Sequence, residues 1–78
     1  MQKYILTIDS SVMEGDTADQ VITDLWQSAR FGEPTIEEYR SGFAKRLATY
    51  NGMVARSATN QELFDDLVSL QALVPLPK

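Results

Sequence analysis

The chain has 78 residues, of which 44% are hydrophobic and 23% charged, a balance typical of a folded protein and not of a disordered tail. Eleven acidic residues against seven basic ones give a net charge of -4, and the sequence has neither cysteine nor histidine. These absences remove disulfides, thiolate ligands, the usual zinc ligands and the acid–base group that titrates near neutral pH. We therefore expect residues 1–78 to form one compact domain with no cofactor, no metal and no enzymatic activity.

Residues 3–9 alternate in polarity, with Tyr4 and Leu6 on the apolar face, which predicts a half-buried β-strand. Its backbone amides and carbonyls need partners from elsewhere in the chain or from outside it. Residues 53–57 and 71–74 are the two internal candidates for a short second strand. If neither pairs, the edge is open to another chain, so a homodimer through the N-terminal strand edge is an alternative.

Residues 9–16 are polar and include Gly15, and this composition predicts a connecting loop. The acids in the segment do not follow the ligand spacing of a calcium-binding EF-hand. We expect no metal site there.

Three capping boxes, in which a threonine is followed three residues later by Gln or Glu, predict where helices begin. They start at Thr17, Thr35 and Thr59, and each precedes apolar residues at three- and four-residue steps. The longest stripe runs through residues 17–30 and includes the only tryptophan, Trp26, which we expect to anchor the core. The predicted fold is α+β, with one N-terminal strand followed by three amphipathic helices (β-α-α-α).

Aromatic and apolar residues divide into two groups by their place in these patterns. Four lie on helical stripes and are expected in the core: Tyr39, Phe43, Tyr50 and Phe64. Met13 and Phe31 fall at element edges, outside the stripes. We expect these two residues at an interface with a partner.

The charges are unevenly distributed along the chain. Between residues 4 and 29 there are five acids and no Lys or Arg, so this segment should repel nucleic-acid phosphates. Four of these acids are expected to contact a partner, namely Glu14, Asp16, Asp19 and Asp24. Four cations form the only basic cluster, which is either an ordinary helix C-terminus or a small patch for an acidic partner: Arg40, Lys45, Arg46 and Arg56.

Two functional classes are consistent with this pattern. The order of one strand and two helices over residues 3–52 resembles that of ribbon-helix-helix DNA-binding regulators, whose strands pair across a dimer. The acidic composition departs from that family, because phosphate attraction supplies most non-specific DNA affinity. In size and charge the chain is similar to phage or mobile-element inhibitors, including anti-CRISPR proteins and DNA mimics. We therefore expect a protein partner with a basic groove and no direct nucleic-acid binding, and keep the regulator as the alternative.

The sequence was also searched for targeting and membrane-spanning segments. The N-terminus lacks the long apolar segment of a signal peptide, and no run of 18 apolar residues occurs. The absence of cysteine fits a reducing compartment. We expect a cytoplasmic protein that does not associate with membranes.

Overall fold

A computed structural model of the chain describes residues 2–8, 10–28 and 33–77. Within these ranges there are three α-helices and three antiparallel strands. In chain order the elements are β1 (Lys3–Leu6), β2 (Ser11–Glu14), α1 (Ala18–Ser28), α2 (Ile36–Arg46), the π-helical turn η1 (Leu47–Asn51), α3 (Asn60–Ser69) and β3 (Leu73–Pro75). The predicted α+β class is confirmed.

The sheet has the strand order β2–β1–β3, with β1 antiparallel to both neighbours. In register, Leu6 lies opposite Ser11 on one side and Leu73 on the other. The candidate strand at 71–74 is therefore confirmed as β3, whereas residues 53–57 form no strand. Because β1 is paired on both sides within the chain, its edge is not free for a homodimer, and that alternative is withdrawn.

β2 lies inside the segment 9–16, for which the composition predicts a loop, and that prediction is wrong. Ser10 adopts a left-handed φ of 64°, and its N–H donates to the Leu6 carbonyl at 2.7 Å, which closes the tight turn between β1 and β2. The strand then alternates, with Val12 exposed and Met13 buried. With only two apolar residues in it, β2 has little strand signal of its own.

The helix starts are confirmed by their caps. The threonine hydroxyl accepts from the backbone N–H three residues later at Thr17, Thr35 and Thr59, over 3.2, 3.2 and 3.1 Å. At the other end of the α2–η1 helix, Gly52 has a φ of 66°, the left-handed conformation in which glycine commonly ends a helix.

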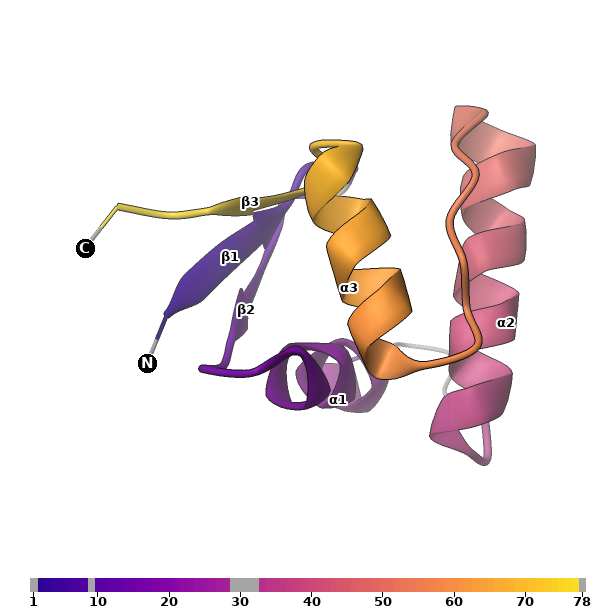
Figure 1. Ribbon diagram of the computed structural model, residues 1–78, viewed down its shortest axis with the longest axis horizontal. Helices are drawn as coiled ribbons and strands as arrows, with labels where there is room; N and C mark the ends of the chain where they lie inside the picture. Colours follow the sequence, from indigo (N-terminus) through magenta and orange to yellow (C-terminus); the bar gives the residue numbers. More distant parts are fainter. Residues whose placement is uncertain (1, 9, 29–32, 78) are drawn as a thin grey trace.

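All these elements contribute to one hydrophobic core. Its fully buried large side chains come from α1, η1, α3 and β3: Val21, Ile22, Leu47, Leu63, Leu67 and Leu73. The sheet lies at one end of the molecule, α3 lies beside it and α2 stands farthest away (Figure 1). Both chain ends are therefore at the sheet, because β1 and β3 are antiparallel neighbours.

The aromatic residues confirm most of the predicted core. Tyr39 and Phe43 are buried, and Phe64 packs against the core and meets the Tyr4 ring edge-on at 5.4 Å. Tyr50, by contrast, is 79% exposed, so the stripe places it wrongly. The π-helical turn explains this difference, since it changes the residue spacing before position 50.

Trp26 is only partly buried, although it packs against the core as expected. Its indole N–H donates to the Glu33 carbonyl at 2.9 Å, which joins the end of α1 to the segment before α2. The ring therefore contributes both apolar contact and one directional bond. None of the described helices is both long enough and apolar enough to cross a membrane.

Candidate partner-binding surface

Three of the four predicted acids line a single open groove between β2 and α1. The groove has a volume of about 600 Å³ and is lined by Val12, Glu14, Asp19, Gln20, Thr23, Asp24 and Gln27. It thus carries three carboxylates and no Lys or Arg among its lining residues. We call this surface the acidic groove.

Close contact between β2 and α1 gives the acidic groove its shape, and Gly15 makes this contact possible. A Cβ at this position would lie 2.7 Å from the Gln20 Cβ and 2.9 Å from the Val21 backbone nitrogen. Both distances are shorter than real Cβ contacts, so a side chain would push α1 away from the strand. Glycine here serves close packing of backbones.

Asp24 joins the two walls of the groove. Its Oδ2 atom accepts from the backbone N–H of Glu14 at 3.0 Å. In the ladder to β1, the next amide, that of Gly15, donates to the Gln2 carbonyl at 2.9 Å. Alternation along an antiparallel strand therefore directs the Glu14 N–H away from β1, toward α1. One carboxylate oxygen is used, and the negative charge remains on the groove surface.

Asp19 is linked to the interior by a chain of hydrogen bonds. Its Oδ1 accepts from the Asn60 side-chain amide at 3.0 Å, and the Asn60 Oδ1 accepts from Arg40 Nη1 at 2.6 Å. Arg40 is only 7% exposed. The amide of Asn60 therefore stands between a buried cation and an acid of the groove.

The other two predicted acids differ in position. Glu14 lies in the groove and forms a loose ion pair with Lys3, 3.8 Å long and largely exposed. Asp16 accepts from the Gln2 backbone N–H at 3.2 Å and does not line the groove. The structure thus brings Glu14, Asp19 and Asp24 together and leaves Asp16 beside them.

The two predicted apolar interface residues do not contribute to this surface as described. Met13 is 4% exposed and belongs to the core, so its expected place at an interface is corrected. The reason is the strand alternation of β2, which turns residue 13 inward and residue 12 outward. Phe31 lies outside the described residues.

Sequence reasoning missed the polar residues that complete the groove. Gln20, Thr23 and Gln27 are spaced by three and four residues, so one flank of α1 could have been read from the helical period. Val12 could not, because its outward direction depends on a strand that the composition did not indicate. Only the fold places it beside α1.

Most of the basic cluster predicted from the sequence is engaged in contacts within the chain. Arg40 donates to the carbonyls of Ser57 and Ala58 at 3.0 and 3.1 Å, and so holds the segment before α3 against α2. Arg46 pairs with Glu33 at 3.2 Å. Among the described residues, Lys45 alone of the four cations has no ion pair or side-chain hydrogen bond. A nucleic-acid or acidic partner would find one free cation here.

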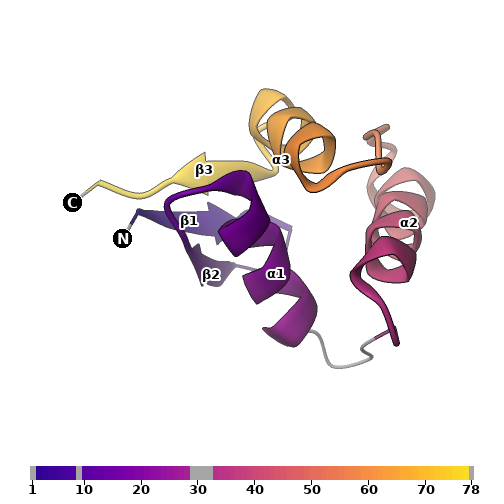
Figure 2. The ribbon, with the colours of Figure 1, turned by 60° about the horizontal axis from the view of Figure 1, so that its bottom comes forward.

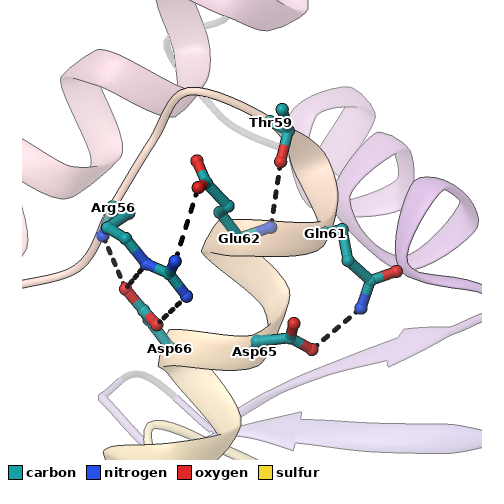
Figure 3. Close-up of polar contacts among 6 residues, drawn as sticks. All are labelled: Arg56, Thr59, Gln61, Glu62, Asp65 and Asp66. Carbon is teal, nitrogen blue, oxygen red and sulfur yellow. Dashed lines mark hydrogen bonds and ion pairs between the residues drawn. The ribbon is translucent and has the colours of Figure 1, made fainter.

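Arg56 is likewise paired within the chain (Figure 3). Its Nε and Nη2 donate to the two carboxylate oxygens of Asp66 at 3.0 and 2.9 Å, and its backbone N–H donates to Asp66 as well, at 2.8 Å. The side-chain and backbone hydrogen bonds hold the pKa of Asp66 below its ordinary value of 3.8, and the same contacts raise the pKa of Arg56. Glu62 adds a longer contact at 3.4 Å.

The position of Arg56 gives this cluster a structural role. The residue lies in the segment between η1 and α3, which runs back beside α2, and Asp66 is in the middle of α3 (Figure 1). The contacts between Arg56 and Asp66 therefore attach this irregular segment to α3. In the described part of the chain, no three acidic side chains are arranged to hold a metal ion.

Comparisons with protein-family models, curated proteins and solved structures gave no significant match to this chain. The functional argument therefore depends on the acidic groove and on the pairing of charges. The likeness to ribbon-helix-helix regulators depends on a strand that is free to pair across a dimer. β1 is not such a strand, because both its neighbours come from its own chain.

Proposed function

We propose that the protein is a small acidic binding protein, without enzymatic activity, that inhibits or modulates a nucleic-acid-handling complex. Its partner would offer a basic groove, in the manner of the targets of phage or mobile-element inhibitors such as anti-CRISPR proteins and DNA mimics. The observation that carries the proposal is the acidic groove, where Glu14, Asp19 and Asp24 converge without a Lys or Arg among the lining residues.

The hydrogen bonds of the groove support this role because they hold the charges in place. Asp19 and Asp24 each use one oxygen on a neutral N–H donor, and the second oxygen has no partner among the described residues. A carboxylate fixed in this way loses little conformational freedom when a cation binds it. Fixed negative charge also speeds encounter with a basic surface, over a range that salt limits to about 8 Å at physiological ionic strength.

The pairing of cations within the chain also supports the proposal. Direct attraction to a phosphate backbone needs several free Lys or Arg side chains on one surface. Here Arg40, Arg46 and Arg56 are engaged by carbonyls, an amide and carboxylates of the chain itself. We expect no appreciable binding to random duplex DNA at physiological salt.

A competition experiment tests the proposal. Labelled duplex is bound to purified nucleic-acid-handling complexes, CRISPR effector complexes among them, and its release by this protein is followed by fluorescence anisotropy. We expect release from at least one complex. The variant D19N/D24N, which keeps an accepting oxygen at both positions but removes two charges, should raise the concentration needed by roughly tenfold.

The matched control is E37Q/E38Q, which removes two exposed charges from the first turn of α2, far from the acidic groove. It should compete like the unchanged protein. Failure to release nucleic acid from any complex would count against the proposal. Salt-sensitive binding of the protein itself to the labelled duplex would instead favour the regulator alternative.

A further inference from the structure

The sheet has an apolar row on the side that faces away from the core. Ile5 in the central strand lies opposite Val12 on one side and Val74 on the other. The alternating residues Leu6 and Met13 point into the core, so this row points away from it. Three β-branched side chains thus cross the outer face of all three strands.

Of the described elements, α1 borders this outer face at the β2 edge, where Val12 and Glu14 also line the acidic groove. Phe64 of α3 packs on Tyr4, on the core side of β1, whereas Ile5 and Val74 do not pack against the core and Val12 is 49% exposed. An antiparallel sheet with one face in water normally carries polar residues on that face. The row departs from this pattern: Val12 is exposed, Ile5 and Val74 are partly exposed, and apolar side chains grouped on an exposed face are typical of an interface.

Both edges of the sheet are protected against strand addition. At the β2 edge, the outward N–H of Glu14 is already bound by Asp24. At the β3 edge, the Thr7 N–H donates to the Ala72 carbonyl and the Leu76 N–H donates to the Lys3 carbonyl. This register places Pro75 at an outward position, where proline has no N–H to donate. A second chain is therefore better accommodated on the face than at an edge.

We propose that this outer face packs against the same face of a second copy. The charges that flank the row identify the occupant: Lys3 and Glu14 lie directly opposite each other in the register, next to the pair Ile5 and Val12. A two-fold axis parallel to the strands and midway between β1 and β2 exchanges the members of each pair. Lys3 of one copy then meets Glu14 of the other, and Ile5 meets Val12.

The distances and the charge balance fit this arrangement. Stacked sheets lie about 10 Å apart, a gap that apolar side chains fill and that Lys and Glu side chains bridge at the margin. Among the described strand residues of the outer face, Lys3 and Glu14 are the charged ones and their charges balance, although the chain has a net charge of -4. Asp19 and Asp24 lie on α1, at the β2 edge of the sheet, where Asp24 binds the outward N–H of Glu14. The inference does not depend on the proposed function, although a dimer through this face would cover Val12 and Glu14, which also line the acidic groove.

The first test measures the oligomeric state of the full chain by sedimentation equilibrium over a wide concentration range. We expect a reversible dimer whose dissociation constant rises at least about tenfold in I5T/V12T, which keeps β-branched shapes but makes the row polar. The control V54T makes the same change at an exposed valine far from the sheet and should leave the dimer unchanged. A monomer at concentrations up to about 1 mM would overturn the inference.

The second test identifies the axis and does not need the threonine variant to fold. K3E and E14K should each weaken the dimer several-fold, because like charges then meet across the interface. The double variant K3E/E14K restores opposite charges and should recover the original dissociation constant. A dimer indifferent to all three variants, or one that V54T weakens as much as I5T/V12T, would overturn the arrangement.

Discussion

The acids on α1 and the acids on α3 all carry carboxylates, but these carboxylates bind different partners. Asp66 and Glu62 on α3 bind the guanidinium of Arg56, so one of their two negative charges is balanced. Asp19 and Asp24 on α1 bind an amide and a backbone N–H, which satisfy hydrogen bonds without cancelling charge. A carboxylate held in place by a neutral N–H donor therefore still presents its negative charge to a partner.

The two regions also differ in what their polar contacts hold together. On the α3 side, Arg40 and Arg56 attach the irregular segment between η1 and α3 to the flanking helices. Figure 2 shows the path of this segment between α2 and α3 from a second direction. On the α1 side, Asp24 attaches a short strand to a helix, and Gly15 lets them approach. Asn60 is the link between the two regions.

The largest effect on stability is expected from R40M, which removes the contacts that hold the segment before α3. The substitution keeps an apolar side chain of similar length but removes three donated hydrogen bonds from a buried position. We expect a loss of about 2–4 kcal/mol in the free energy of unfolding, since bonds from charged donors contribute more than neutral ones. Urea denaturation measures it. K45M, on the same helix at an exposed position, should change stability by less than about 0.5 kcal/mol.

G15A should disturb the packing of α1 against β2 by steric overlap. Its new methyl group overlaps Gln20 and the Val21 backbone, and we expect about 1–3 kcal/mol of destabilisation together with a displaced α1. G52A is the matched comparison, because nothing lies near its methyl group and only the φ of 66° opposes it. It should cost about 1 kcal/mol, and thermal unfolding of both variants compares them. Equal values would mean that β2 and α1 tolerate separation.

Two variants of Asp24 distinguish the contribution of its hydrogen bond to stability from the contribution of its charge. D24A leaves the Glu14 N–H to water and should cost about 0.5–1.5 kcal/mol in chemical denaturation. D24N retains an accepting oxygen and should stay close to the unchanged protein. If both variants were equally destabilised, charge and not the hydrogen bond would be what joins the groove walls.

The smallest effect is expected at Asp66 and depends on pH. Because the folded-state pKa of Asp66 lies below its unfolded value, its stabilisation is complete above the ordinary value of 3.8 and is lost as pH falls through the lowered pKa. Arg56, with a raised pKa, stays charged throughout. D66N should therefore lower the melting temperature slightly near neutral pH and reduce its fall in acid. Melting curves from neutral to strongly acidic pH check this, and a parallel fall in D66N would exclude the pair as a cause.

Local features of the chain could be predicted from the sequence. The capping threonines predict three helix starts, and residues 71–74 are one of the two candidates for a second strand, because both signals lie within a few adjacent residues. The negative charge of α1 could also be predicted, since Asp19 and Asp24 fall off its apolar stripe.

Features that depend on distant residues could not be predicted. β2 exists because a serine takes a left-handed φ and because β1 offers a partner, and neither is visible in its composition. Met13 is buried for the same reason. Arg40 has the sequence context of a surface cation, yet carbonyls 17 and 18 residues further on enclose its guanidinium. The groove, which needs β2, was beyond sequence reasoning as well.

The central claim is that the acidic groove, and not the paired acids of α3, attracts a cationic partner. Titration with a short oligo-arginine peptide, followed by amide shifts in two-dimensional NMR, tests this most directly. The account predicts the largest shifts at Asp19, Thr23, Asp24 and Gln27, decreasing as salt is raised and much reduced in D19N/D24N. Shifts centred on Glu62, Asp65 and Asp66, or spread evenly over all acids, would contradict it.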